Sequence, residues 1–296
     1  MKELVKLTND FLGITNEISA PIIITLITFF ISLSLTNIGL IFKRYRDRRI
    51  YRRVIKNAAL RLNKQIIKQS QEFKKSSDNI SFKNDVGFKF GRVQLLSIET
   101  FESIGYKKAV ESYLIGAENL SLPYFNKDTI KTKALDKLWE SILSIHYWHD
   151  KFISDTNIFL EKYNQYNESR NNAIDQYNQI YLRSVNEANE NHVRELEYLR
   201  KITEIRKDWV GLVDNNRADI CHEQLVIPIR KISENYSDLK IAIEINLVLL
   251  RASHEYTNQS NTVDFNKKLF LNYSINFRNY SRIISKCIQI LDRCYE

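Results

Sequence analysis

Residues 18–42 read ISAPIIITLITFFISLSLTNIGLIF, and the residues 43–57 that follow them read KRYRDRRIYRRVIKN. The first stretch contains no ionisable side chain, and as a helix it would be about 37 Å long at 1.5 Å per residue. That length crosses a hydrocarbon core of roughly 30 Å with some tilt. A buried core helix of this length would carry charges on one face, and a cleaved signal sequence has a shorter apolar run. The stretch therefore predicts an uncleaved transmembrane helix over residues 18–42.

Charge on the two sides of this helix predicts its orientation. Residues 1–17 carry two Lys against two Glu and one Asp, whereas residues 43–57 carry eight basic groups and one Asp. Lys and Arg beside a span stay on the cytoplasmic side. We therefore expect residues 1–17 to be extracytoplasmic, the rest of the chain to be cytoplasmic, and the protein to lie in the inner (plasma) membrane.

The basic residues after the span are expected to contact lipid headgroups. A nucleic-acid-binding domain would spread its basic residues over a groove or recognition face. Here they lie within about four helical turns of the bilayer, where they suit anionic lipid. The residues predicted to make this contact are Lys43, Arg44, Arg46, Arg48, Arg49, Arg52 and Arg53. The lipid bilayer is thus the first expected partner, and nucleic acid is not expected to bind this segment.

The chain as a whole has the composition of an all-α protein. With 7 Gly and 3 Pro in 296 residues, it lacks the turn residues and glycine loops of β-sandwiches, barrels and nucleotide-binding α/β folds. Its hydrophobic content of 44% is enough to build a core. We expect a basic juxtamembrane helix over residues 43–75, a loop over 76–91 and a cytoplasmic helical domain over 92–296. This domain would be a bundle of four or five long helices, partly coiled-coil-like.

Helix boundaries within the cytoplasmic part are predicted from Pro and from Asn-rich stretches. Interruptions are expected at Asn164–Asn172 and at Asn258–Asn261, and Pro228 would begin or kink a helix. The expected helices span residues 92–119, 228–256 and 263–293, and residues 128–215 are expected to form either one very long helix or two in sequence. Alternation of Phe82, Val86, Phe88 and Phe90 with polar residues would also suit a short strand or hairpin within the loop.

A seven-residue repeat in the middle of the chain indicates how its helices pack. The repeat is irregular, because Glu195 interrupts an otherwise apolar or aromatic series. The positions in this seam are Ile174, Tyr181, Ala188, Glu195, Ile202 and Trp209. Antiparallel packing against other helices of the same domain is therefore expected in place of a regular dimeric zipper.

Residues that could hold a metal or a cofactor form no complete pattern in the sequence. His146, His149 and Asp150 lie within one turn of an expected helix, where the two histidines could share a metal ion. Two ligands from one helix do not hold zinc without a third ligand from elsewhere in the chain. The cysteines are expected to be reduced and to pack as small apolar side chains. They are Cys221, Cys287 and Cys294. We therefore expect no metal site and no cofactor.

One short motif points to an enzymatic alternative. Residues 217–222 read RADICH, which resembles the Arg-x4-His motif of HEPN-domain ribonucleases, a family of all-helical proteins. The resemblance implies that Arg217 and His222 would act on the scissile phosphate and on the ribose 2′-hydroxyl, with two motifs meeting across a dimer interface. Ala218 departs from the polar residue that commonly follows the Arg in that family. A solvated Arg217 at a loop-to-helix junction is the structural alternative.

Together these features predict a single-pass membrane-anchored protein that acts as an interaction, scaffold or sensor module at the cytoplasmic face. The expected protein partners are a second copy of the chain or another helical protein, because confinement to a membrane raises effective concentration. An enzyme is not favoured. Two alternatives stay open: a defence or toxin effector with HEPN-like ribonuclease activity through Arg217 and His222, and an effector that perturbs the membrane after oligomerising through its span.

Overall fold

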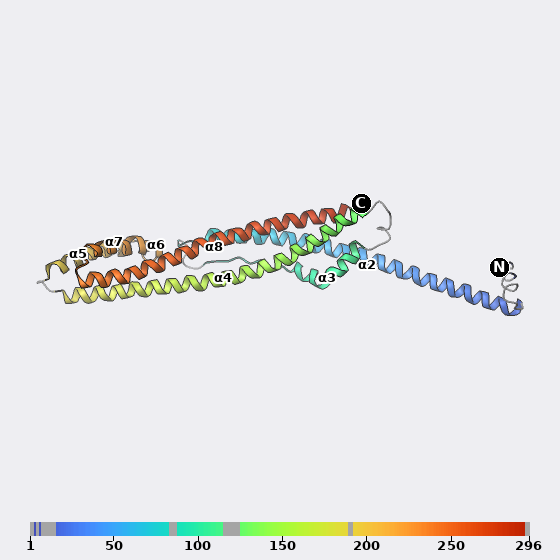
Figure 1. Ribbon diagram of the computed structural model, residues 1–296, viewed down its shortest axis with the longest axis horizontal. Helices are drawn as coiled ribbons and strands as arrows, with labels where there is room; N and C mark the ends of the chain where they lie inside the picture. Colours follow the sequence, from blue (N-terminus) through green and yellow to red (C-terminus); the bar gives the residue numbers. More distant parts are fainter. Residues whose placement is uncertain are drawn as a thin grey trace. The chain divides into compact units, whose positions relative to one another are not determined.

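The computed structural model of the chain is all-helical, as the composition predicts (Figure 1). It describes residues 16–82, 88–114, 125–188 and 192–293, together with positions 3 and 6, and no strand occurs in these residues. The expected extracytoplasmic segment 1–17 therefore lies almost wholly outside the described residues. The elements in chain order are α2 (Asn16–Asn79), α3 (Ser97–Tyr113), α4 (Phe125–Glu187), α5 (Val193–Val210), α6 (Ala218–Cys221), the π-helical turn η4 (His222–Val226), α7 (Ile227–Asn235) and α8 (Lys240–Arg293).

The apolar stretch forms the first part of α2, which continues without a break through the basic residues. The most apolar window of 18 residues has a mean hydropathy of 2.0, and none of it is buried within the structure. Thr25, Thr28 and Thr36 return their hydroxyls to backbone carbonyls four residues earlier at 2.7–2.8 Å. Among the described residues this is the one helix long and apolar enough to cross a membrane.

The chain divides into two compact units. The first consists of residues 1–61, 97–139 and 286–296, and the second of residues 62–96 and 140–285. In the first unit, Phe101 of α3 packs edge-to-face on Trp139 of α4, and their ring centroids are 5.7 Å apart. Lys56 of α2 pairs with Asp292 of α8 at 2.7 Å. These contacts join parts of four helices that are distant in sequence.

The second unit has an aromatic core between α2, α4 and α8. Phe73 of α2 packs on Phe152 and Phe277, with ring centroids 4.3 and 4.8 Å apart. Phe270 lies 5.1 Å from Phe152, and the Tyr273 hydroxyl donates to Asp155 at 2.6 Å. Aromatic rings in edge and tilted geometry add to the free energy gained from area burial.

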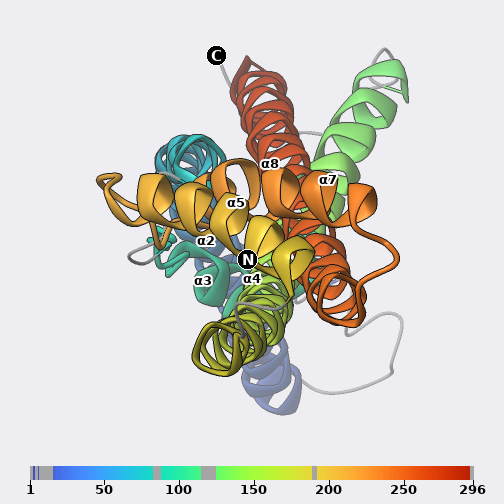
Figure 2. The ribbon, with the colours of Figure 1, turned by 90° about the vertical axis from the view of Figure 1, so that its left-hand side faces the viewer.

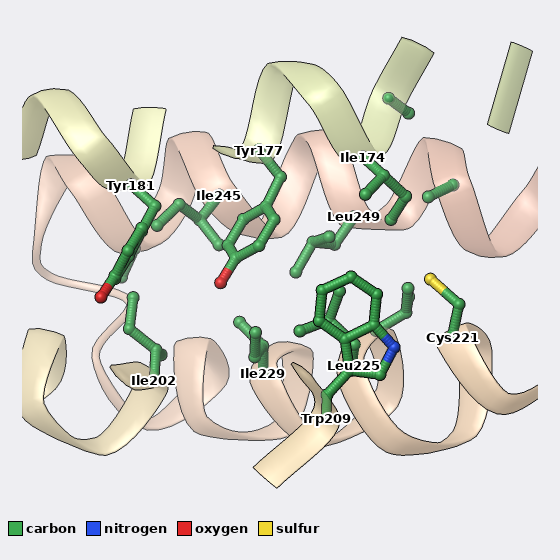
Figure 3. Close-up of a cluster of buried hydrophobic side chains, with 14 of the residues drawn as sticks. Ile174, Tyr177, Tyr181, Ile202, Trp209, Cys221, Leu225, Ile229, Ile245 and Leu249 are labelled. Carbon is green, nitrogen blue, oxygen red and sulfur yellow. The ribbon is translucent and has the colours of Figure 1, made fainter. Parts of the chain in front are cut away.

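A second core in this unit joins α4, α5, α7 and α8. Figures 1 and 2 show α5 and α7 side by side over the pair formed by α4 and the first turns of α8. In Figure 3, Tyr177 of α4 and Leu249 of α8 point toward Ile229 and Leu225, and all four side chains are buried. Tyr181 bonds Thr203 at 3.0 Å while Asn178 accepts from Arg206, so α4 and α5 run antiparallel.

The predicted seam is therefore divided between two helices. Ile174 and Tyr181 lie on α4 and Ile202 and Trp209 on α5, and all four are buried. Within the second unit, α4 and α5 pack antiparallel to each other. The chain leaves the helix after Glu187, so the long helical stretch expected over residues 128–215 is two helices.

Both interruptions predicted at Asn-rich stretches are wrong. α4 continues through Asn164–Asn172 and α8 through Asn258–Asn261. The amides in these stretches have partners inside the bundle, because Arg170 bonds both Asn167 and Gln259. A polar residue that is paired on the inner face of a helix does not end the helix.

Other predicted boundaries shift as well. α2 runs to Asn79, past the expected loop start at residue 76, because Ser77 is 2% exposed and bonds the Lys267 carbonyl of α8 at 2.7 Å. The helix expected over 92–119 begins at Ser97 and ends at Tyr113, and its expected end at residue 119 lies outside the described residues. The helix expected over 228–256 is two helices, since α7 ends at Asn235 and α8 begins at Lys240.

The segment before α3 forms no strand in its described residues 88–95. Phe88 and Phe90 both pack into the aromatic core. The ring centroid of Phe88 lies 5.1 Å from that of Phe159, and the ring centroid of Phe90 lies 5.5 Å from that of Phe270. Gln69 of α2 donates to the Gly91 carbonyl and accepts from the Val93 amide. The Gln69 side chain thus takes the place of the partner strand in the predicted hairpin. Val86, which belongs to the predicted pattern, lies outside the described residues.

Candidate functional site

The predicted lipid-contact residues lie on one continuous helix. They follow Phe42, the last residue of the uncharged stretch, on the next three turns of α2. Lys43, Arg44, Arg46, Arg49 and Arg53 are exposed, whereas Arg48 and Arg52 are half-buried. The basic residues therefore differ in their surroundings, and those that face α3 must be distinguished from those that face solvent.

α3 packs against the basic part of α2 at its C-terminal end. Arg52 donates through Nε to the Ser112 carbonyl, and the Tyr113 hydroxyl donates to the Arg52 carbonyl at 3.2 Å. Carbonyls in the last turn of a helix lack partners within the helix, and a guanidinium is a favourable donor to them. Lys108 of α3 lies 5.6 Å above the ring of Tyr51. Arg52 is therefore engaged in holding α3, which the sequence did not indicate.

A groove of about 520 Å³ lies between these parts of α2 and α3. We call it the headgroup groove, and its lining residues are Arg44, Asp47, Arg48, Tyr51, Lys108, Glu111 and Ser112. Three cations face two carboxylates there. Arg44, Arg48 and Lys108 form no ion pair with any residue that the structure describes, and Asp47 has Arg46 at 3.9 Å. The free basic groups and the concave shape make this a candidate anion-binding site.

Arg217 and His222, the predicted ribonuclease pair, lie on either side of α6. Arg217 precedes α6 and forms a two-point ion pair with Asp219, with both N···O distances 2.8 Å. This hydrogen bonding holds the pKa of Asp219 below its usual value. His222 opens η4 and stacks on Tyr256 of α8, with ring centroids 4.1 Å apart. Burial lowers the pKa of His222 and favours its neutral form.

A polar layer that was not predicted lies near this histidine in the second unit. Arg170 of α4 is only 4% exposed and donates to Gln259 at 2.8 Å, to Asn167 at 2.7 Å and to Asn171 at 3.0 Å. Its Nε is buried and bonds none of the described residues, and the same holds for Nδ1 of His222. Arg170 also lowers the pKa of His222 through its positive charge, after burial and Arg230. A cation among neutral amides is unusual inside a bundle.

The residues considered for a metal do not converge in the described part of the chain. His146 and His149 approach Asp150 at 3.5 and 3.9 Å, all on α4, and no group of three His, Cys, Asp or Glu side chains suited to a metal occurs among the described residues. Cys221 is buried, and burial raises the pKa of its thiol to about 11, so the unreactive protonated form dominates. Cys287 is also buried, and Cys294 lies outside the described residues.

Comparisons with protein-family models, with characterised proteins and with solved structures find no match to this chain.

Proposed function

We propose that the chain is a single-pass membrane protein anchored by the first part of α2, with its basic residues and helical units on the cytoplasmic side of the inner membrane. One observation carries the proposal: an apolar helix wholly exposed in the structure runs directly into the basic residues. Exposed leucines, isoleucines and phenylalanines would be costly in water but favourable in lipid. The charge difference across the helix supports the orientation, with residues 1–17 outside.

The cytoplasmic part acts, in this proposal, as an interaction, scaffold or sensor module that self-associates or binds a helical partner. The support is an exposed apolar line on α8, where Ile243, Leu247 and Leu250 are 46%, 61% and 47% exposed. Their spacing of four and three residues is that of a coiled-coil seam. Membrane confinement would strengthen even a weak contact of this kind.

Fractionation of cells that make the full-length chain tests the anchor. The chain should stay in the membrane pellet after alkaline carbonate washing, because carbonate releases proteins held by charge alone. A variant with Leu33→Arg and Leu35→Arg should move to the soluble or aggregated fraction, since charges at a helix centre cost about 2.5–3.5 kcal/mol each. A matched variant with exposed Leu143→Arg and Leu182→Arg on α4 should remain in the pellet. Release of the unmodified chain by carbonate would overturn the proposal.

The ribonuclease alternative is the weaker proposal. Ribonuclease activity needs an Arg217 side chain that is free to reach a phosphate. In the structure, however, the Arg217 guanidinium donates two hydrogen bonds to the Asp219 carboxylate. RNA cleavage by the purified chain that disappears in His222→Ala with folding intact would establish it, and absence of cleavage by a folded dimer would remove it. For the membrane-perturbing alternative, dye leakage from vesicles should be lost when Thr25 and Ser32 are replaced by Leu, and unchanged leakage would exclude it.

A further inference from the structure

We propose that the headgroup groove binds the headgroup of one anionic glycerophospholipid, whose phosphodiester is held by Arg44, Arg48 and Lys108. The inference rests on the proposed membrane anchoring and goes beyond it. It assigns to α3 a part in lipid recognition and separates a defined site from the diffuse charge of the basic segment. The structure supplies four arguments, from position, charge, hydrogen-bonding groups and size.

The position of the groove along α2 matches the headgroup layer. Arg44 lies two residues and Arg48 six residues beyond Phe42, which places their Cα atoms about 3 and 9 Å past the end of the uncharged stretch. The polar layer on each side of a bilayer is about 5–8 Å thick. Side chains on a helix generally lean toward its N-terminus, which for Arg44 and Arg48 is the direction of the uncharged stretch.

The charges that line the groove are available to a ligand. Arg44 and Arg48 share one face of α2 with Tyr51, at a spacing of four and three residues, and Lys108 faces them from α3. Other basic residues of the same helix are engaged: Arg52 with the Ser112 carbonyl and Lys56 with Asp292. A phosphodiester oxygen in the groove would gain charge-assisted hydrogen bonds that no described residue now provides.

The two carboxylates indicate which headgroup fits. Asp47 and Glu111 line the groove and accept hydrogen bonds only, so they favour a headgroup that carries hydroxyl or ammonium donors beside its phosphate. The glycerol of phosphatidylglycerol has such donors, whereas choline has neither an N–H nor an O–H group. Phosphatidylglycerol also carries the net negative charge that three cations against two carboxylates favour. The Tyr51 hydroxyl adds a donor for a phosphate or glycerol oxygen.

The volume of the groove suits a single headgroup. About 520 Å³ falls within the range of roughly 300–1,000 Å³ that is usual for small-molecule sites. The acyl chains of a bound lipid would then run along the uncharged stretch of α2, which is exposed over its described side chains.

The test uses the full-length chain purified in mild detergent and titrated with short-chain phosphatidylglycerol, short-chain phosphatidylcholine and inorganic phosphate. Native mass spectrometry counts the bound molecules, and calorimetry gives the affinity. The site variant combines Arg44→Gln, Arg48→Gln and Lys108→Gln. The control variant combines Arg61→Gln, Lys64→Gln and Lys107→Gln, three exposed residues on the same helices that lie outside both the groove and the predicted lipid-contact residues. Both variants lose three positive charges, and circular dichroism checks that both remain folded.

The chain should bind one phosphatidylglycerol at least tenfold more tightly than phosphatidylcholine. The site variant should lose at least tenfold in that affinity and the control variant less than threefold. Equal losses in both variants would overturn the site in favour of diffuse charge. Equal binding of the two lipids would overturn the headgroup assignment, and phosphate binding as tight as lipid binding would indicate a soluble anion instead. Carbonate-resistant membrane association with no lipid preference would refute this inference alone, whereas carbonate release of the chain refutes the anchor itself.

Discussion

At the scale of single residues, Arg170 holds two long helices of the second unit in register. It is 4% exposed on α4 and reaches Gln259 of α8, which is fully buried. No carboxylate among the described residues pairs with it. Burying a guanidinium is costly unless its donors are paired, and the Nη1 and Nη2 donors of Arg170 pair with neutral amides. The amide of Gln259 therefore fixes which turn of α8 lies opposite Arg170.

Replacing Arg170 by Met should destabilise the second unit by about 1–3 kcal/mol, because Gln259 would lose its donor while it stays buried. The double variant Arg170→Met, Gln259→Leu should recover most of that loss, since both polar partners are then replaced by apolar groups of similar size. Thermal unfolding of the full chain in detergent, followed by circular dichroism, compares the three proteins. A double variant as unstable as the single one would show that the amide layer does not fix the packing.

The half-buried His222 predicts how the stability of the fold depends on pH. Burial, with Arg230 and Arg170 nearby, lowers its pKa below the ordinary 6.5. In the unfolded chain the His222 imidazole takes up a proton below about pH 6.5, whereas in the folded chain it does so only at a lower pH. The free energy of unfolding therefore falls as the pH falls. The melting temperature of the His222→Gln variant should therefore fall by less between pH 7.5 and pH 5.5 than that of the unmodified chain.

The control for this experiment is His254→Gln, which removes an exposed histidine from α8. It should show the same pH dependence as the unmodified chain. His149 has a pKa lowered in the same direction by its own burial, so some dependence should remain in His222→Gln. A pH dependence that is identical in His222→Gln and the unmodified chain would contradict the prediction.

At the scale of elements, α3 depends on a backbone bend at Gly105. This residue has φ 72° and ψ 152°, a conformation that is essentially restricted to glycine. The bend lets Phe101 on one side and Ala109 and Tyr113 on the other all be buried. No atom lies within 4 Å of a Cβ built at Gly105, so any cost of a side chain there comes from the backbone.

Gly105→Ala should therefore destabilise α3 and its contact with α2 by about 1–3 kcal/mol. Hydrogen exchange of the α3 amides, which reports local opening, measures the effect. Gly211→Ala serves as the control, because Gly211 has φ −73° and a Cβ there meets only ordinary contacts. In the Gly211→Ala variant, the protection of the α3 amides from exchange should change by less than about 0.5 kcal/mol. Equal protection of α3 in Gly105→Ala and the unmodified chain would show that the bend is not needed.

Helix content was predictable from the sequence, whereas several helix ends were not. The scarcity of Gly and Pro correctly predicts an all-α chain, and Pro228 does lie in the first turn of α7. Asn167 and Gln259 lie in stretches that look like breaks in one dimension, yet they pair with Arg170 across two helices. Which polar residue finds a buried partner is decided by tertiary packing, and that information is not local in the sequence.

The candidate site was half predictable for the same reason. The basic face of α2 follows from a run of Arg and Lys next to an apolar stretch. Lys108 and Glu111 come from α3, whose placement depends on the Arg52 contact with the Ser112 carbonyl. No spacing rule connects residues sixty apart, so the second wall of the groove was missed.

At the scale of the whole molecule, the exposed line on α8 predicts self-association. Leu247 is 61% exposed between Ile243 and Leu250, and Leu247→Glu would place a charge within any interface formed by this line. The variant should lower the mass of the purified complex, measured by light scattering in mild detergent. Leu143→Glu is the control, because Leu143 is 60% exposed on α4 and lies outside the line. A monomeric unmodified chain would contradict the prediction, as would the same mass for both variants.

The proposed orientation in the membrane links the proposed anchor, the headgroup groove and the helical units, and one protease-protection measurement tests it. A tag at the carboxyl end of the full chain is exposed to protease in sealed inside-out vesicles and in sealed right-side-out vesicles from the same cells. The account predicts that the tag is digested in inside-out vesicles and protected in right-side-out ones, because the basic residues after Phe42 keep that side cytoplasmic. Digestion in right-side-out vesicles with protection in inside-out ones would contradict it.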